Sequence, residues 1–304
     1  MHLGARRPAQ DHRVVPEGSI ARVLVTGAGG LMGQALVRAF AGHAQALPKT
    51  RAELDVTDAR AVAGCLDELH PSAVLNAAAF TDVDAAESRT REAEAVNVTG
   101  VRNLAASCAQ RGILLVGLGT DYVFDGVLRR PYREDDPPRP LSAYGRSQLA
   151  GEHALAEAGG EFLLVRTQGL YGSGRPTLVH RLLAVEDPEA EVRMVADRTS
   201  QPSWADEVAD AVRELWRCGA RGVVHVANTG PLTWYEFTVM LHEESGRPRG
   251  RILSIAAAQR SEAAVRPAYS ALDTGRYEAL TGRRLRGVRE ALRAFLQQEG
   301  VTRG

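Results

Sequence analysis

The feature that most constrains this chain is a glycine-rich turn between a short apolar run and an amphipathic segment. The run Arg22-Val23-Leu24-Val25-Thr26 has the length of a strand, and apolar residues recur with helical spacing over 31–40. Between the two lie Gly27, Gly30 and Gly33, spaced GxxGxxG. Such glycines permit a tight turn, close approach of a pyrophosphate to the backbone, and close helix packing. The pattern predicts a dinucleotide site at a helix amino terminus, with a purely structural turn as the alternative.

Strands and helices alternate through the first half of the chain. Apolar runs predict strands at 73–77, 114–118 and 162–166, and helical spacing predicts helices at 96–111 and 144–157. Strands that alternate with helices form parallel sheets covered on both faces. The expected fold class is α/β, a doubly wound parallel sheet of the Rossmann type with a smaller C-terminal lobe.

Prolines interrupt the pattern beyond residue 171 and predict short elements there. We expect a flexible tail at 1–20 and a dinucleotide-binding Rossmann domain at 21–172. Residues 173–304 are expected to form mainly a substrate-binding lobe, with some segments returning to the Rossmann domain.

Composition excludes several classes of function. Lys+Arg and Asp+Glu both number 37, so the net charge of zero argues against nucleic acid as a partner. The apolar runs are strand-sized, so no membrane span is expected. Cys65, Cys108 and Cys218 are far apart and lack metal-ligand spacing, which favours a reducing cytoplasm and predicts no metal site.

Two charged residues after the first helix are candidates for the adenosine end of a dinucleotide. Arg51 could meet a 2′-phosphate, which would favour NADPH, and Asp55 could accept a hydrogen bond from adenine. A solvated surface charge explains either residue equally well.

Several motifs occur in one order along the chain. They lie at 76–87 (NAAAFTDVDAAE), 96–97 (VN), 120–126 (TDYVFDG), 144–152 (YGRSQLAGE), 166–172 (RTQGLYG), 197–203 (DRTSQPS) and 266–273 (RPAYSALD). In these residues the chain resembles the dTDP-4-dehydrorhamnose reductases, which are extended short-chain dehydrogenases that reduce a 4-keto sugar nucleotide with NADPH or NADH. The similarity covers about residues 21–296.

The resemblance implies a set of site residues. Tyr144 would give a proton to the ketone oxygen while hydride passes to the carbon, and the Thr120 hydroxyl would hold the same oxygen. The implied cofactor residues are Gly27, Gly30, Leu31, Met32, Gly33, Arg51, Asp55, Val56, Asn76, Ala77, Ala78, Ala79 and Asn97. The implied substrate residues are Thr81, Val83, Asp121, Tyr122, Gly169, Thr177 and Arg266.

One departure from the family falls on the catalytic helix. The family has a lysine four residues after the tyrosine, where its charge lowers the pKa of the tyrosine; here that position holds Gln148. A glutamine amide can bind ribose hydroxyls but carries no charge. Arg146 points to another face of the helix, and Lys49, the only lysine, belongs to the adenosine end.

Three further departures lie on the substrate side. Gly119 stands where the family commonly has serine, and Gln168-Gly169 stands where it often has Ser-Trp. Pro176-Thr177-Leu178 replaces the usual Asn-Phe after the next glycines. Each change alone is compatible with drift, whereas together with Gln148 they favour an altered substrate or an altered activity.

The leading hypothesis is therefore an NAD(P)H-dependent reductase that acts on the 4-keto group of a nucleotide-activated deoxysugar in cell-surface or secondary-metabolite glycosylation. We expect it in the cytoplasm, with a homodimer as one candidate assembly. The alternative is a weakly active or inactive NADP-binding regulatory subunit resembling the β subunit of methionine adenosyltransferase. A third reading, epimerisation or dehydration with tightly held NAD, is disfavoured by Gln148.

Overall fold

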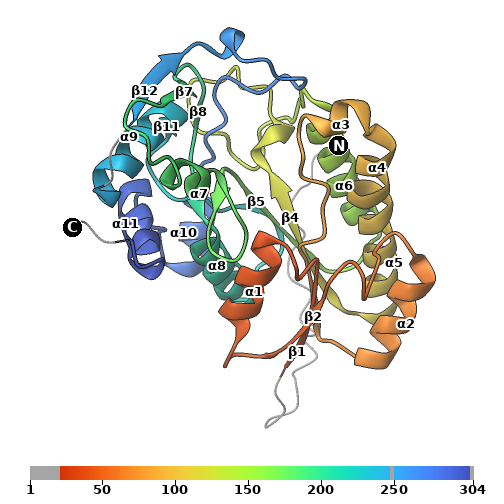
Figure 1. Ribbon diagram of the computed structural model, residues 1–304. Coiled ribbons are helices and arrows are strands. Elements are labelled where there is room, and N and C mark those ends of the chain that lie inside the picture. The colour runs from red at the N-terminus through yellow and green to blue at the C-terminus, as the bar shows by residue number, and fades with distance from the viewer. Residues whose placement is uncertain (1–20, 247–249, 302–304) are drawn as a thin grey trace.

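The central sheet has six parallel strands. A computed structural model describes residues 21–246 and 250–301, so the tail expected at 1–20 lies outside the described residues. The strand order is β10-β5-β4-β3-β1-β2 (Figure 1). The strands are β1 (Arg22–Thr26), β2 (Gln45–Lys49), β3 (Ala73–Asn76), β4 (Leu114–Thr120), β5 (Phe162–Thr167) and β10 (Gly222–His225). This arrangement confirms the predicted α/β fold class of the Rossmann type.

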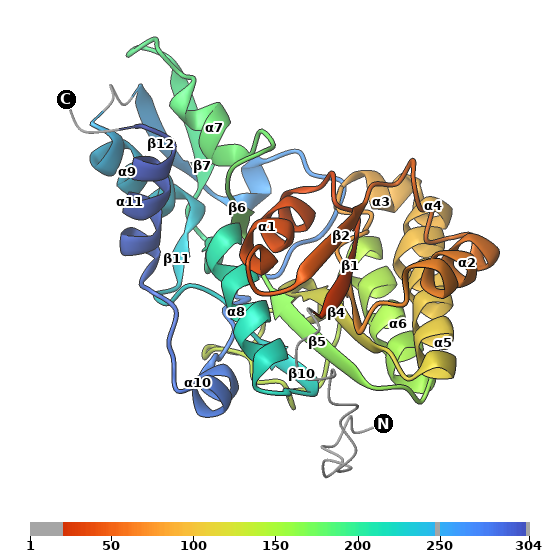
Figure 2. The same ribbon diagram turned by 90° about the horizontal axis from the view of Figure 1, so that it is seen from below.

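Helices cover both faces of the sheet (Figure 2). On one face, α1 (Leu31–Phe40) packs beside α8 (Ala205–Arg217) over a core that includes Val25, Leu36 and Val212. The opposite face carries α2 (Ala59–Leu69), α5 (Val101–Arg111) and α6 (Ala143–Glu157). Helices α1, α2 and α8 each bury one apolar stripe and leave charged residues in water, whereas α6 also buries Gln148 and Glu152. The strand order reverses between β1 and β3, and crevices for ligands open at such points, outside the carboxyl ends of the strands.

A third core lies under the elements that follow residue 170. It is built around Phe237 and Phe295 and is separate from the two cores of the sheet. Its principal elements are α7 (Leu178–Leu183), β7 (Glu191–Val195), α9 (Trp234–Ser245), β12 (Arg251–Ile255) and α11 (Val288–Gln298). Short strand pairs join this region together: β6 (Leu170–Tyr171) with β9 (Ser203–Trp204), and β8 (Thr199–Ser200) with β11 (Leu232–Thr233).

The remaining elements are short. They are α3 (Ala85–Ser88), α4 (Thr90–Glu94), η1 (Ala95–Gly100), η2 (Asp121–Val123), η3 (Ala257–Gln259) and α10 (Gly275–Thr281). None of the helices within the described residues is long and apolar enough to cross a membrane.

Two sequence predictions about the elements were wrong. Beyond residue 171 the chain forms α8, α9 and α11, of 13, 12 and 11 residues, rather than short elements alone. The helix predicted at 96–111 begins instead with the π-helical turn η1, which contains Asn97. The physical reason is the close approach of α6, since a Cβ on Gly151 would lie 2.1 Å from the carbonyl oxygen of Asn97. Wide helical turns of this kind are often found at functional sites.

The chain does not divide cleanly at residue 172. Strand β10 pairs with β5 at the edge of the sheet, and α8 lies against α1, although both follow that residue. The proposed boundary between a dinucleotide domain and a substrate lobe stays a prediction.

The glycine turn yields a stability prediction. A Cβ on Gly33 would lie 2.2 Å from the carbonyl oxygen of Gly27, so Gly33→Ala must shift the backbone of the turn or helix α1. We expect it to lower the free energy of unfolding by about 1–3 kcal/mol. Gly64 is the matched control, because it lies within α2 with no atom within 4 Å of its would-be Cβ. Gly64→Ala should raise stability by about 0.5–1 kcal/mol. Urea denaturation measures both, and equal stability of Gly33→Ala and the wild type would contradict the packing argument.

Candidate active site

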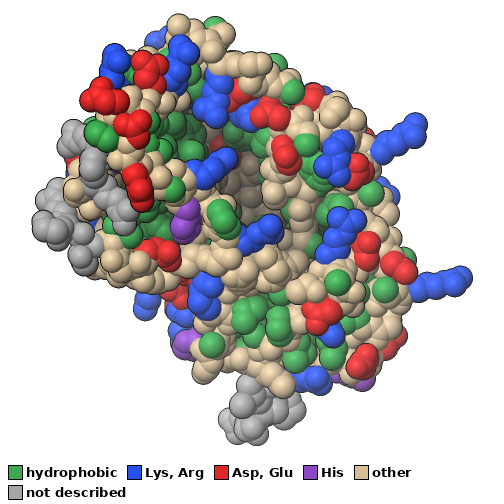
Figure 3. All heavy atoms as spheres, viewed as in Figure 1, with side chains coloured by type: hydrophobic (Ala, Val, Ile, Leu, Met, Phe, Trp, Pro, Cys, Tyr) green, Lys and Arg blue, Asp and Glu red, His purple; other side chains and the backbone are tan. Residues whose placement is uncertain are grey.

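A cavity of about 780 Å³ opens at the carboxyl ends of β1, β3, β4 and β5. Its size falls within the range of small-molecule sites, about 300–1,000 Å³. Figure 3 shows it as a hollow in one face of the molecule, with Lys and Arg side chains on its rim. Seventeen of the predicted site residues line it: Gly30, Leu31, Met32, Asn76, Ala77, Ala78, Ala79, Thr81, Val83, Thr120, Asp121, Tyr122, Tyr144, Gln148, Gly169, Thr177 and Arg266. Sequence motifs that are far apart in the chain therefore meet in one place.

The glycine turn presents the amino terminus of α1 to this cavity. Gly27 has φ +62°, and a Cβ there would lie 2.6 Å from the backbone of Ala77, so both conformation and space require glycine. Gly30 precedes α1 and contributes no capping side chain, and the first turn of the helix holds no acidic residue. The first N–H groups of α1 are therefore free to bind an anion, with the helix dipole in support. This geometry fits the pyrophosphate of a dinucleotide.

Six predicted cofactor residues do not line the cavity, and their roles stay predictions. Gly27 and Gly33 pack against each other inside the turn, and Val56 is buried against Gly100. Arg51 is exposed just beyond β2. The Asp55 carboxylate accepts hydrogen bonds from the Thr57 backbone and hydroxyl, which lower its pKa.

Asn97, the sixth of these predicted cofactor residues, connects two segments of the chain by hydrogen bonds. Its side chain bonds both backbone groups of Phe80, at 2.8 and 3.1 Å, and donates to the Ser147 hydroxyl at 2.9 Å. It thereby ties the loop after β3 to helix α6, which carries Tyr144.

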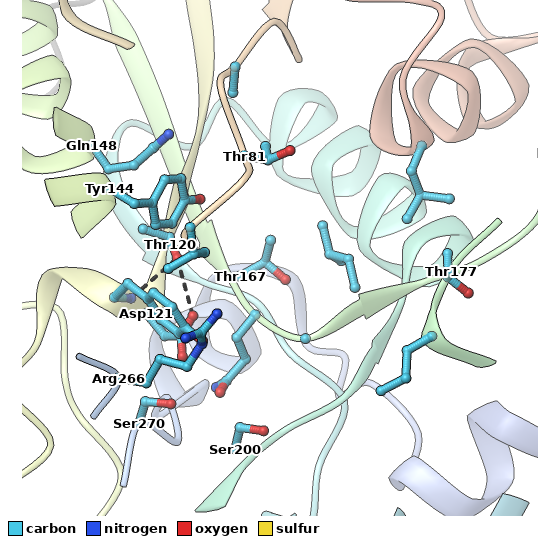
Figure 4. A pocket seen from close by; sticks show the side chains of 18 of the residues that line it. Thr81, Thr120, Asp121, Tyr144, Gln148, Thr167, Thr177, Ser200, Arg266 and Ser270 are labelled. Carbon is cyan, nitrogen blue, oxygen red and sulfur yellow. Dashed lines mark hydrogen bonds between the residues drawn. The ribbon is translucent and has the colours of Figure 1, made fainter. Parts of the chain in front are cut away.

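Tyr144 and Thr120 lie side by side in the wall of the cavity (Figure 4). Thr120 ends β4, and Tyr144 lies in the first turn of α6, whose N-cap Ser142 accepts from the Gly145 N–H at 3.1 Å. The Tyr144 ring meets the Tyr122 ring edge to face, with centroids 5.9 Å apart. Packing therefore fixes the direction of the Tyr144 side chain.

The environment of Tyr144 keeps its hydroxyl protonated. Desolvation by the surrounding protein raises the pKa of Tyr144 well above its ordinary value. A hydrogen bond from Thr120 opposes this, whereas Asp121 and Tyr122 raise the pKa further. No arginine contributes to the shift, although Arg266 and Arg198 act on the neighbouring Tyr122. Tyr144 is therefore a proton donor throughout the neutral range.

Gln148 occupies the position where a lysine would supply a positive charge and lower the pKa of Tyr144. It lies one helical turn after Tyr144, is only 7% exposed, and lines the cavity. Its amide makes no hydrogen bond to any other described side chain or backbone group, so it is available to a ligand. Arg146 points away, as predicted, and bonds the carbonyl oxygen of Leu141.

Gly119 borders a buried ion pair. Arg166 and Glu152 are each 2% exposed at the side chain and form two hydrogen bonds, of 3.0 and 2.6 Å. A Cβ on Gly119 would lie 2.8 Å from a Glu152 oxygen and 3.0 Å from Arg166 Cγ. The glycine therefore gives this pair its room.

Gln168 and Gly169, which differ from the usual family residues, also meet local hydrogen-bonding and packing requirements. Gln168 donates to the Gln201 side chain at 2.8 Å and accepts from its N–H at 3.0 Å, and Gln201 in turn accepts from the Leu272 N–H at 2.7 Å. Gly169 has φ +58°, and a Cβ would lie 2.9 Å from Pro202 Cα. This backbone cannot accept a tryptophan at 169 without moving, so the glutamine pair and the glycine belong together.

Thr177 and Arg266 hold loops in the wall of the cavity. Thr177 is the N-cap of α7, and its hydroxyl lies 2.9 Å from His180 Nδ1. Arg266 bonds both oxygens of Asp84, at 3.0 and 2.8 Å, joining the late chain to the loop after β3. The ion pair and its hydrogen bonds hold the pKa of Asp84 at about 2.

Sequence reasoning missed further cavity residues. They are Arg175, Arg181, Met194, Val195, Arg198, Ser200, Trp234, Arg260, Glu262 and Ser270. Three of them, Arg198, Ser200 and Ser270, lie in the motifs at 197–203 and 266–273 and could have been found there. The others carry no local signal, because only the tertiary fold brings them to the cavity.

Asp121 yields a pH prediction. Desolvation raises its pKa to about 7, although hydrogen bonds from Ser270 and Thr120 lower it. A raised folded-state pKa stabilises the fold at low pH, and that contribution is lost as pH rises from about 4 through 7. Asp121→Asn removes the titration. Between pH 5 and pH 8 the free energy of unfolding of the wild type should therefore fall by about 2–3 kcal/mol more than that of Asp121→Asn. Urea denaturation at both values tests this, and a pH-independent difference would refute a neutral Asp121.

Comparisons with known proteins identify the family. The family model described as RmlD substrate binding domain matches residues 21–301. The dTDP-4-dehydrorhamnose reductase of Streptomyces griseus is 38% identical over 278 residues, 89% of this chain and 91% of the relative. The spore coat polysaccharide biosynthesis protein SpsK of Bacillus subtilis (strain 168) is 36% identical over 279 residues, 91% of this chain and 97% of that protein.

Solved structures agree as well. A dTDP-4-dehydrorhamnose reductase from Bacillus anthracis, crystallised with NADP, matches with a TM-score of 0.89 and 29% identity over 92% of this chain and 100% of that one. The resemblance drawn from the motifs is thereby confirmed. The chain belongs to the RmlD substrate binding domain family.

Proposed function

We propose that this protein reduces the 4-keto group of a dTDP-activated deoxysugar, with NADPH as the hydride donor. The observation that carries the proposal is the convergence of Tyr144 and Thr120 in a cavity that also receives the free amino terminus of α1. Two of the proteins described above support it, since both are named dTDP-4-dehydrorhamnose reductase and one was crystallised with NADP. They do not favour the regulatory-subunit alternative.

The cofactor half of the proposal rests on the first β-α turn. NADPH would supply the hydride, and the free N–H groups in the first turn of α1, from Leu31 onward, would hold its pyrophosphate. Asn76 supports this edge, because its side-chain oxygen accepts from the Thr26 hydroxyl at 2.6 Å and from the Ala78 N–H at 3.2 Å. The backbone from Asn76 to Ala79 is thereby held along the cavity, where it would flank the nicotinamide.

The sugar nucleotide would occupy the other end of the cavity. Arg175 and Arg181 line it there and form no ion pair with any described residue, so both guanidinium groups are free to bind a diphosphate. The half-buried Trp234 and the side chains of Met194 and Val195 offer an apolar surface to a pyrimidine base. The sugar then lies between these arginines and Tyr144.

In the reaction, Tyr144 would donate its proton to the ketone oxygen as the carbon is reduced. Thr120 would donate a hydrogen bond to the same oxygen and stabilise the developing negative charge. Gln148 would bind the ribose hydroxyls of the cofactor without lowering the pKa of Tyr144. This arrangement predicts a working but slow reductase.

The direct test is NADPH oxidation, followed at 340 nm, with dTDP-4-keto-6-deoxyglucose and dTDP-4-dehydrorhamnose. We expect turnover that Tyr144→Phe lowers by about 100-fold or more, since general acid catalysis contributes about 10²–10⁴-fold. Tyr235→Phe is the control, because Tyr235 lies outside the cavity lining. Absence of oxidation with every 4-keto sugar nucleotide would refute the proposal.

A second experiment addresses the lysine position. Gln148→Lys should raise kcat by about tenfold or more, because a cation one turn from Tyr144 favours the phenolate and strengthens the acid. Gln148→Met keeps the length but adds no charge, so it should give no gain. An unchanged kcat in Gln148→Lys, with cofactor affinity intact, would mean that the pocket does not use charge at this position.

A further inference from the structure

The hydroxyl of Thr120 has a single proton, and two neighbours, the Asp121 carboxyl and the Tyr144 phenol, compete for it. Thr120 Oγ1 donates to a carboxylate oxygen of Asp121 at 3.2 Å and accepts from the Tyr122 N–H, also at 3.2 Å. A hydroxyl has one donor and two acceptor positions. While Thr120 donates to an ionised Asp121, it cannot donate to a ketone oxygen. The state of Asp121 therefore decides what Thr120 can do.

The surroundings of Asp121 favour its neutral form. The residue is 3% exposed and forms no ion pair with any described Lys or Arg. Figure 4 shows Thr120, Tyr144, Ser270 and Arg266 around it. The Thr120 and Ser270 hydroxyls form hydrogen bonds with it, and the Tyr122 and Tyr144 phenols interact with it. A buried carboxylate without a cationic partner is costly, and protonation removes that cost.

The nearby cations are engaged elsewhere. Arg266 pairs with Asp84 and Glu262, and Arg198 also pairs with Glu262. Their influence reaches the phenol of Tyr122 rather than the carboxyl of Asp121. Gln148, at the lysine position, adds no charge on the other side.

We propose that Asp121 in its neutral form is a positioning residue that donates its carboxyl proton to Thr120 Oγ1, which turns the Thr120 hydroxyl toward the ketone oxygen and feeds a proton back to Tyr144. The inference rests on the proposed reductase function. The Tyr144 O–H bond breaks as the ketone oxygen is protonated. The Thr120 proton then passes to the tyrosinate, the Asp121 proton passes to Thr120, and water returns a proton to the Asp121 carboxylate. Reduction of the ketone takes up one proton from water in total.

The chain Asp121–Thr120–Tyr144 has a pH signature. Desolvation raises the pKa of Asp121 to about 7, whereas Tyr144 stays protonated well beyond that. A loss of activity near neutral pH would therefore report Asp121 and not the tyrosine. We expect kcat to fall as pH rises through about 7, by about tenfold per pH unit.

The test is the pH profile of kcat from pH 5.5 to 9. Asp121→Asn should lower kcat at pH 6 by roughly tenfold or more and abolish the alkaline decline, since an amide donates to Thr120 at every pH but releases no proton. Ser270→Ala should move the decline to higher pH, because the Ser270 hydrogen bond favours the ionised form of Asp121. If Asp121 had a purely structural role, neither substitution would change the pH at which kcat declines. Persistence of the wild-type decline in Asp121→Asn, or an unshifted decline in Ser270→Ala, would overturn the proposal.

Asp125→Asn is the matched control. Asp125 accepts from the Tyr132 hydroxyl at 2.8 Å and from the Val127 N–H at 3.2 Å, outside the cavity lining. Its profile should follow that of the wild type.

Infrared difference spectra of the NADP complex give a readout that needs no turnover. We expect a protonated-carboxyl C=O band at pH 6 that fades by pH 8.5 and is missing in Asp121→Asn. Absence of this band would overturn the Asp121 proposal even if the enzyme turns over. A clear band without turnover of any 4-keto sugar would instead leave Asp121 neutral and refute the reductase function.

Discussion

The close contact between α1 and the turn that precedes it is the constraint on which the rest of the site depends. Gly33 lies so near Gly27 that no side chain fits between them, and Gly27 lies equally near Ala77. Together these contacts place the amino terminus of α1 beside the carboxyl ends of β1 and β3. The bond between Thr26 and Asn76 joins the two strands at the same level. A crevice at a reversal of strand order is general to this fold class, and here Gly27 and Gly33 permit the close packing at its edge.

Electrostatics, more than shape, distinguishes this cavity. Five arginines line the cavity: Arg198, Arg260 and Arg266 pair with Glu262, whereas Arg175 and Arg181 form no ion pair with a described residue. The groups around Tyr144 are hydroxyls, an amide and a carboxyl. Charged ligand groups such as diphosphates are favoured at Arg175 and Arg181. The region around Tyr144 is a place for proton transfer in a poorly solvated setting, where each hydrogen bond counts for more than in water. A sugar nucleotide has this same division between a charged end and a neutral end.

Sequence patterns predicted the sheet, the glycine turn and the meeting of the main motifs, because each depends on local periodicity or on a fixed edge of a parallel sheet. Thr120 and Tyr144 were placed in the site by the family resemblance, and the position of Thr120 at the end of a strand agreed with it. Arg175 and Arg181 could not be predicted, because their place depends on how the region after residue 170 packs over the sheet. The π-helical turn at Asn97 was missed for the same reason, as it follows from contact with Gly151.

The departures from the family differ in kind once their contacts are known. Gly119, the Gln168-Gly169 pair and Thr177 each satisfy a local packing or capping requirement, so they need no functional explanation. Gln148 satisfies none, since its amide has no partner among the described residues, and it is the change that bears on chemistry. A cation at 148 would favour the ionised form of every acid near it, the Asp121 carboxyl as well as the Tyr144 phenol. With glutamine there, Asp121 keeps its proton below about pH 7, and Tyr144 keeps its proton well beyond that. The uncharged residue thus removes the usual means of strengthening the tyrosine, and it leaves a neutral carboxyl two hydrogen bonds away as the nearest source of a second proton.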